Sequence, residues 1–290
     1  MGAASGFVDA HHHVWDLARR PQPWLADPGR EPLRRSFAVD ELARTAERGL
    51  AGRPLGATVL VQCLTSTAET EEFLALAART PLVAGVVGWV DLTDPAVGDE
   101  LDRLIAGPGG ALLRGVRHLV QAEPDPAWLL RPDVGRGLAA VQARGLTYDL
   151  LVLPHQLPAA VELARRLPEL LLVLDHAGKP PLRHGVDAVA RWVGDLRALA
   201  AAGPVVCKLS GLVTEAVQGW MAEDLRPATE AVLEAFGPER TMFGSDWPVC
   251  EASGGWVRWA EAAEELLAPL SATERDSVLS ATASRCYRLL

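Results

Sequence analysis

The sequence of 290 residues lacks the patterns that mark zinc-stapled domains, dithiol enzymes, membrane proteins and secreted proteins. Its four cysteines, at positions 63, 207, 250 and 286, form no CxxC pair, which argues against a zinc knuckle and a dithiol redox site. No uncharged apolar run approaches the roughly 18 residues that span a membrane. Residues 1–6 lack the basic start and apolar stretch of a signal peptide. These absences predict a cytoplasmic protein that does not enter a membrane.

Positive charge is also scarce. Lys and Arg total 28 against 37 Asp and Glu, and the resulting net charge of -9 would repel a phosphate backbone, so we expect no nucleic-acid partner. The hydrophobic fraction of 49% with 22% charged residues is typical of a globular protein with a large core. We therefore expect one domain over residues 1–290 that binds a small-molecule substrate. The sequence does not determine the oligomeric state, and a homo-oligomer is one alternative.

Apolar, β-branched runs alternate with amphipathic helical patterns along the whole chain, which is typical of repeated βα units on a parallel sheet. Eight runs are expected to be strands: 7–10, 57–62, 83–90, 113–119, 146–152, 170–175, 205–209 and 241–244. The count and order predict an α/β fold, a single-domain (β/α)8 TIM barrel, with a doubly wound open sheet as the alternative. The Pro-rich segment 20–32 follows the first strand and is expected to form a pocket wall or lid.

Three consecutive histidines end the first predicted strand. Because alternate strand residues share a face, His11 and His13 should point the same way and His12 the opposite way. Two imidazoles side by side at a barrel mouth make half of a ligand set for a divalent metal.

Three further polar residues follow predicted strands, where the active sites of barrel enzymes lie. His155 follows the fifth strand, His176 ends the sixth and Asp246 follows the eighth. Either histidine alone could be a hydrogen-bonded surface or core residue. Asp246 suits a metal ligand or a proton-transfer base, and capping of the next helix is its structural alternative.

Four motifs in this order resemble the amidohydrolase superfamily, of the amidohydrolase-2 type, in the branch of sugar lactonases and 2-pyrone-4,6-dicarboxylate lactonase. They are DAHHHVWD at 9–16, LDHAGKP at 174–180, KLSGL at 208–212 and FGSDWP at 243–248. The resemblance covers residues 7 to about 290. It implies a barrel with a site made of His11, His13, His155, His176 and Asp246.

The resemblance also implies a metal centre and its limits. We expect His11, His13, His155 and Asp246 to hold one divalent ion, zinc by preference, with Asp246 and His176 as catalytic residues. Two-metal relatives carry a bridging lysine after the fourth strand, where this sequence reads RGVRH at 114–118, so a second ion is not expected. Some members of the branch need no metal, and that alternative stays open.

Two cations and three aromatic residues near the motifs are candidates for substrate binding. Arg117 and Lys208 could bind a carboxylate or polarise a carbonyl, with an ordinary salt bridge as the alternative. The nine tryptophans include Trp15, Trp89 and Trp247 beside motif residues, where a flat ring suits the apolar side of a sugar, although core packing is the slightly favoured role.

Together these features predict a hydrolase of carbohydrate catabolism that opens a cyclic ester, an aldonolactone, to its hydroxy acid. The alternatives are hydrolysis of a carboxylated ring such as a pyrone dicarboxylate, with or without a metal, and a decarboxylation of the same superfamily. A catalytically inactive barrel that binds a sugar acid is the alternative outside enzymes.

Overall fold

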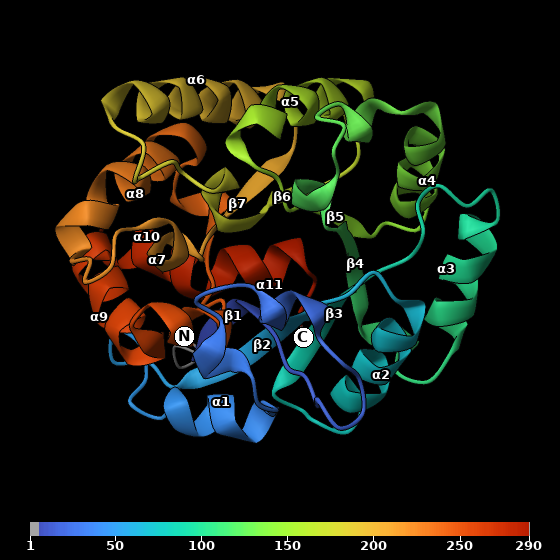
Figure 1. The fold of residues 1–290 in the computed structure, drawn as a ribbon, viewed down its shortest axis with the longest axis horizontal. Helices are drawn as coiled ribbons and strands as arrows, with labels where there is room; N and C mark the ends of the chain where they lie inside the picture. Colours follow the sequence, from blue (N-terminus) through green and yellow to red (C-terminus); the bar gives the residue numbers. More distant parts are fainter. Residues whose placement is uncertain (1–5, 290) are drawn as a thin grey trace.

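In the computed structural model, residues 6–289 are described; residues 1–5 and 290 of the predicted domain lie outside the described residues. Eight parallel strands form a barrel in chain order (Figure 1). They are β1 (Phe7–His12), β2 (Leu55–Val61), β3 (Val83–Gly88), β4 (Leu113–His118), β5 (Thr147–Leu150), β6 (Leu172–Leu174), β7 (Val205–Leu209) and β8 (Thr241–Phe243). A parallel bridge between His12 and Trp247 joins the first strand to the segment after the last. The unbroken order confirms the TIM barrel and excludes a doubly wound sheet, whose strand order reverses.

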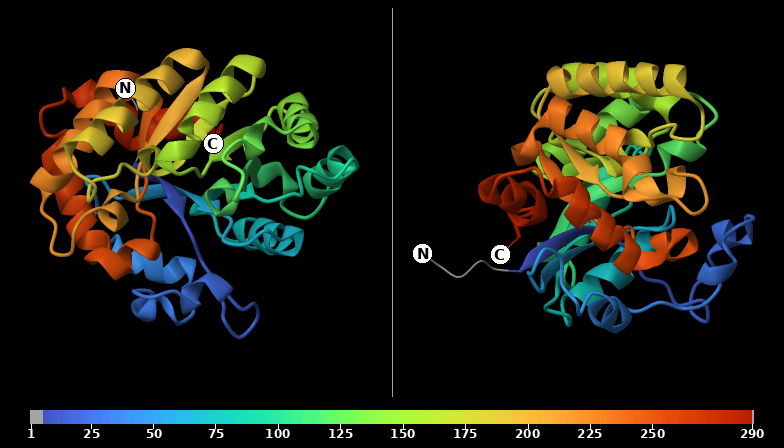
Figure 2. Two further views of the ribbon diagram at one scale, coloured as in Figure 1. Left: turned by 45° about the horizontal axis from the view of Figure 1, so that its top comes forward. Right: turned by 90° about the vertical axis from the view of Figure 1, so that its left-hand side faces the viewer.

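Helices follow the strands and form the outer layer (Figure 2). The α-helices are α1 (Val39–Thr45), α2 (Thr67–Ala77), α3 (Val97–Ala106), α4 (Pro132–Ala143), α5 (Leu157–Arg166), α6 (Val186–Ala202), α7 (Leu212–Glu215), α8 (Ala222–Phe236), α9 (Gly255–Leu267), α10 (Ala272–Asp276) and α11 (Thr282–Cys286). Within residues 6–289, no helix is both long and apolar enough to cross a membrane.

Local sequence explains where these elements begin and which faces they bury. β6 is apolar throughout and fully buried, because the barrel interior covers one face and helices cover the other. Ser66 caps α2 by accepting a hydrogen bond from the backbone N–H of Glu69. Pro132 begins α4, where the missing N–H costs nothing. All eight strands run parallel, so their carboxyl ends lie at the same end of the barrel.

One segment lies beside each end of the barrel. The insertion after β1 contains the short 3-10 helices η1 (Pro23–Ala26) and η2 (Glu31–Leu33), and an antiparallel bridge between Trp15 and Phe37 closes its base. At the opposite end, the π-helical turn η10 (Ser277–Ala281) and α11 lie where β1 begins (Figure 2). Tyr287, just after α11, belongs to an apolar cluster with residues of β1, β2, β3, β6, β7 and β8 at that end.

Candidate active site

A cavity of about 1140 Å³ opens at the carboxyl ends of the strands. Polar residues from five strand ends line it: His13, Cys63, Arg117, His176 and Asp246. The insertion after β1 contributes Trp24 and residues 27–30, which confirms its prediction as a pocket wall. Because barrel enzymes carry their active sites on this face, the cavity is the candidate active site.

The first strand brings His13 to the cavity lining and buries His11 beside it. The Nε2 atoms of His11 and His13 lie 3.2 Å apart, and both residues are buried. His12 turns the other way, with its Nε2 2.9 Å from Thr58 Oγ1. The predicted alternation along the strand is thus confirmed. The Nδ1 of His13 donates to the Val61 carbonyl at 2.8 Å, which leaves its Nε2 lone pair for a ligand.

His176 reaches the same point from a left-handed turn after β6. The φ angles are 53° at His176, 52° at Ala177 and 55° at Lys179, a conformation that costs energy in residues with a Cβ atom. A Cβ atom at Gly211 would lie 2.5 Å from the His176 Nδ1, so only glycine leaves room for the ring. The His176 Nδ1 lies 2.9 Å from Ser210 Oγ. Burial lowers the pKa of His176 to about 4, so the ring is neutral near pH 7.

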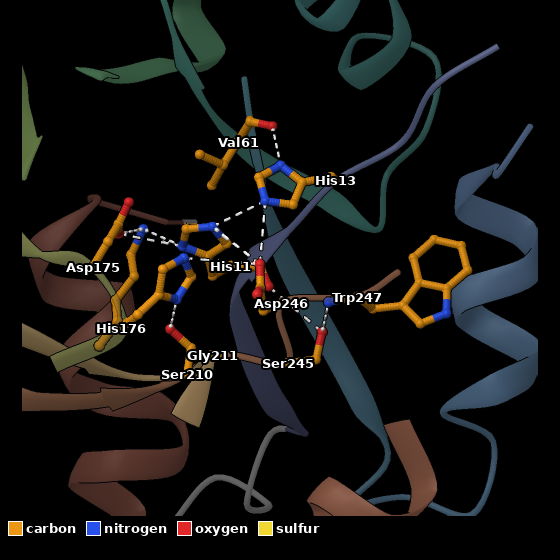
Figure 3. A network of polar contacts seen from close by, with 12 residues as sticks. His11, His13, Val61, Asp175, His176, Ser210, Gly211, Ser245, Asp246 and Trp247 are labelled. Atoms are coloured by element: carbon orange, nitrogen blue, oxygen red, sulfur yellow. Dashed lines mark hydrogen bonds and ion pairs between the residues drawn. The ribbon is translucent and has the colours of Figure 1, made fainter. Parts of the chain in front are cut away.

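Asp246 completes the cluster from the segment after β8. Its Oδ1 lies 3.3 Å from His13 Nε2, 3.7 Å from His11 Nε2 and 3.9 Å from His176 Nε2 (Figure 3). Burial alone would raise the pKa of Asp246, but the neighbouring imidazoles, His176 first, outweigh it and hold the pKa below its usual range. The side chain is therefore a carboxylate that faces three imidazoles.

The loop that carries Asp246 is fixed by its neighbours. Ser245 donates from its backbone N–H and its hydroxyl to the two oxygens of Asp9, at 2.8 and 2.6 Å. Burial raises the pKa of Asp9 to about 6. The next helix, η9 (Val249–Ser253), has no side-chain cap, and Cys250 N–H bonds to the backbone carbonyl of Asp246. Capping is therefore not the role of the Asp246 carboxylate.

The donor set fits one divalent cation. His11 Nδ1 lies 3.2 Å from Asp175 Oδ1, so each of the three imidazoles has an outward partner for Nδ1 and turns Nε2 inward. Ligand atoms of His11, His13 and Asp246 lie within 4.8 Å of one another. Burial lowers the pKa of His11 well below its usual value, which keeps the ring neutral, as metal ligation requires. Neutral imidazoles with a carboxylate are a typical zinc ligand set.

A charged layer lies under the histidines. Arg117 Nη1 is 2.9 Å from Asp175 Oδ2 and 3.2 Å from His11 Nε2, and Arg117 also lines the cavity. Lys208 Nζ is 2.6 Å from Asp149 Oδ2 and 3.0 Å from Asp175 Oδ1, and it is fully buried. Arg117 can therefore meet a substrate, whereas the prediction of Lys208 as a substrate-binding residue is corrected. Lys208 points into the barrel interior, where two carboxylates already hold it.

His155 is also corrected. It is exposed on the 3-10 turn η6 (Pro154–Gln156) and is absent from the cavity lining. β5 ends at Leu150, so the chain has already turned outward toward α5 when it reaches His155. Among residues 6–289, the groups that could hold a metal contain His176 and not His155.

The three tryptophans predicted to bind substrate, Trp15, Trp89 and Trp247, are absent from the cavity lining. The indole N–H of Trp15 donates to a backbone carbonyl at 2.7 Å, and that of Trp89 to a histidine ring at 3.0 Å. Trp247 is 1% exposed and packs in the core. Two tryptophans that the sequence analysis did not single out, Trp24 and Trp220, line the cavity instead.

Sequence reasoning also missed two buried carboxylates, Asp149 and Asp175. Both had a signal in the sequence. Asp149 is the one charge in the apolar run 146–152, and Asp175 directly precedes His176 in a run that is otherwise apolar. A carboxylate in a buried strand requires a charged or hydrogen-bonding partner, so either residue could have been predicted to contact Arg117 or Lys208.

Comparison with known proteins identifies the family of this chain. The family model described as amidohydrolase matches residues 8–289. The chain belongs to the amidohydrolase family. It is 41% identical to an L-fucono-1,5-lactonase of Burkholderia multivorans over 305 residues, which cover 100% of this chain and 97% of that enzyme. The family resemblance seen in the sequence is thus confirmed.

Two solved structures extend the comparison. An amidohydrolase of Burkholderia multivorans with bound zinc superposes with a TM-score of 0.89 at 40% identity, and covers 99% of this chain and 100% of that one. A putative 2-pyrone-4,6-dicarboxylic acid hydrolase of Pseudomonas putida gives a TM-score of 0.71 at 26% identity, with 98% and 97% covered. Both share the barrel along its whole length.

Proposed function

We propose that the protein hydrolyses the lactone of a sugar acid and releases the open-chain hydroxy acid. The observation that carries the proposal is the cluster of His13, His176 and Asp246 in the cavity lining, with the buried His11 against them. The chain also matches an L-fucono-1,5-lactonase over its full length at 41% identity. The enzyme is a hydrolase that acts on a cyclic ester. L-Fucono-1,5-lactone is the first substrate to test.

Hydrolysis requires a base for water and a positive group for the oxyanion that forms on the carbonyl. The Asp246 carboxylate lines the cavity and accepts the proton of the attacking water. It then returns that proton to the ring oxygen as the ester bond breaks, so that an alcohol leaves rather than an alkoxide. Arg117 supplies a fixed positive charge to the cavity wall. Lys208 has no part in these steps, because it is buried below the histidines.

We further propose that His11, His13 and Asp246 hold one divalent ion, zinc by preference. An ion held by these residues would supply Lewis acidity and would lower the pKa of water to about 7. The neutral imidazoles and their outward Nδ1 partners support this assignment. His176 Nε2 lies 3.9 Å from Asp246 Oδ1, and the residue lines the cavity, where it orients the water or the carbonyl group.

Hydrolysis of a carboxylated ring is the second candidate, and the cavity lining favours it. Five cations lie there: Arg30, Arg117, Lys179, Arg183 and Arg258. Several of them already have partners, because Arg183 donates to two backbone carbonyls and Lys179 pairs with Glu215 at 3.5 Å. The full-length identity is also lower for the pyrone relative, at 26% against 41%. We therefore rank the neutral sugar lactone first.

One panel tests both candidates. The purified protein is assayed with aldono-1,5- and aldono-1,4-lactones and with a pyrone dicarboxylate, and acid release is followed with a pH indicator against spontaneous hydrolysis. We expect turnover of L-fucono-1,5-lactone that is lost on chelation and returns with zinc. Faster turnover of the pyrone would favour the second candidate. No hydrolysis above background would refute the function, and full activity after exhaustive chelation would refute the metal.

A further inference from the structure

A row of buried polar groups crosses the barrel interior from its closed end to the active site. The Tyr287 hydroxyl donates to Asp149 Oδ2 at 2.6 Å, and Lys208 Nζ lies 2.6 Å from the same oxygen. Lys208 then contacts Asp175 Oδ1 at 3.0 Å, and this oxygen lies 3.2 Å from His11 Nδ1. All five side chains are fully buried. The row thus connects a residue after the last helix to a proposed metal ligand.

This row of polar side chains lies where the interior of a TIM barrel normally contains apolar side chains. TIM barrel interiors are filled mainly by layers of branched apolar side chains. Here Asp149, Asp175, Lys208 and Arg117 form a layer with two negative and two positive charges. Burying such a set costs desolvation energy that the ion pairs do little more than offset, and apolar residues of similar size usually serve stability as well. Stability alone therefore does not explain the row.

Its geometry instead explains the orientation of His11. Asp175 accepts a hydrogen bond from the Arg117 guanidinium with Oδ2, at 2.9 Å, and its Oδ1 lies 3.2 Å from His11 Nδ1. Lys208 Nζ lies 3.3 Å from the same His11 nitrogen. These contacts fix the plane of the ring and direct its Nε2 toward His13 and Asp246. Lys208 holds Asp175 Oδ1 from below and shares its charge with Asp149. The position of Lys208 between the two carboxylates thus decides how firmly Asp175 is held.

We propose that Tyr287 is a positioning residue for the active site, acting through Asp149, Lys208 and Asp175 on the ring of His11. The inference rests on the proposed role of His11 as a metal ligand. Without the Tyr287 hydroxyl, Asp149 loses one of its hydrogen-bond donors and draws Lys208 away from Asp175. His11 then loses part of the support that directs its Nε2, although Tyr287 itself never touches the cavity.

Tyr148 provides a matched control in the same part of the barrel. It precedes Asp149 on β5 and, like Tyr287, is fully buried. Its hydroxyl is buried without a hydrogen-bond partner among residues 6–289. Tyr287→Phe and Tyr148→Phe therefore remove the same atom from two equally buried rings. Only the first removes a hydrogen bond of the row.

Three measurements are made on both variants and the parent: zinc affinity by competition with a chelating dye, kcat and KM on the lactone, and the unfolding temperature. We expect Tyr287→Phe to bind zinc about 10-fold more weakly, the lower end of the loss seen when an outer partner of a ligand is removed. Its kcat should fall while KM stays unchanged. Tyr148→Phe should match the parent in zinc affinity and kcat.

Parental zinc affinity and kcat in Tyr287→Phe would overturn the proposal, as would an equal loss in both variants or a parent that binds no zinc. If Tyr287→Phe does not fold, Asp149→Asn takes its place, since the amide keeps the size of the carboxylate and removes the negative charge that pairs with Lys208. Parental zinc affinity in Asp149→Asn would also overturn the proposal. The zinc measurement needs no substrate. A parent that binds zinc but opens no lactone thus refutes the function, and not this inference.

Discussion

Replacement of Asp246 by Asn separates the proposed chemistry from the fold. The amide keeps the shape of the carboxylate but cannot accept a proton from water. Asp246 adopts a left-handed backbone with φ 56°, and Asn is one of the few residues with a Cβ atom that adopts this conformation readily. The backbone bond from Asp246 N–H to the His11 carbonyl, at 2.8 Å, is independent of the side chain. We therefore expect the cavity to keep its shape.

The expected magnitudes differ between stability and rate. The free energy of unfolding should change by about 1 kcal/mol, the usual net worth of one hydrogen bond. The rate should fall much further, because positioned proton transfer is worth about 10²- to 10⁴-fold, or roughly 3 to 5.5 kcal/mol in the barrier. Loss of a charged metal ligand adds to this, so we expect kcat to fall by about 10⁴-fold or more.

The assay is kcat on the best lactone of the panel, together with the unfolding temperature of each protein. Asp125→Asn is the control, since Asp125 is exposed. Within residues 6–289 its carboxylate accepts a hydrogen bond only from the Ala127 backbone N–H, which an amide oxygen also accepts. We expect parental kcat in the control and near-complete loss in Asp246→Asn at a similar unfolding temperature. Parental turnover in Asp246→Asn would remove the residue from the mechanism. Loss of the folded state instead would show that the carboxylate mainly serves stability.

Two further predictions follow from the cavity lining. His176→Ala should lower kcat by about 10²-fold because the ring faces Asp246. His155→Ala should leave kcat and stability unchanged because its side chain is exposed. Steady-state kinetics on both variants test this, and a larger loss in His155→Ala would contradict it. Trp24→Ala should raise KM by about 3- to 10-fold at unchanged kcat, as expected when a ring that only binds substrate is removed. A fall in kcat without a change in KM would show that Trp24 acts on the reaction step.

Periodicity predicted the barrel because the strands are buried on both faces and short helices separate them. The strand ends were less predictable. The apolar run 146–152 continues past the end of β5 at Leu150, since apolar residues also fill the turn beneath the cavity. His155 was misplaced for the same reason. A strand end drawn two residues too late brought His155 to the barrel mouth, whereas the chain turns outward before it.

The site residues were predictable where strand alternation fixes their direction. His11 in β1 and His13 just past its end turn their rings to the same side, and Asp246 follows a strand that ends at Phe243. Sequence adjacency did not place the aromatic rings in the same way. Trp247 neighbours Asp246 but packs against Phe37, with ring centroids 5.4 Å apart. Trp24 lies in an irregular insertion, whose path no periodic pattern specifies.

Backbone strain and side-chain size explain the motifs around the site. Both the turn after β6 and the segment after β8 place a reactive side chain in a left-handed conformation, at His176 and Asp246. Such residues cost of order 1–3 kcal/mol each and persist only where their surroundings hold them. A Cβ atom at Gly244 would lie 2.8 Å from the His11 Cβ atom, so this glycine lets β8 approach β1 closely. The small residues beside the reactive ones are therefore required by the backbone, and the strained turns aim His176 and Asp246 at one point.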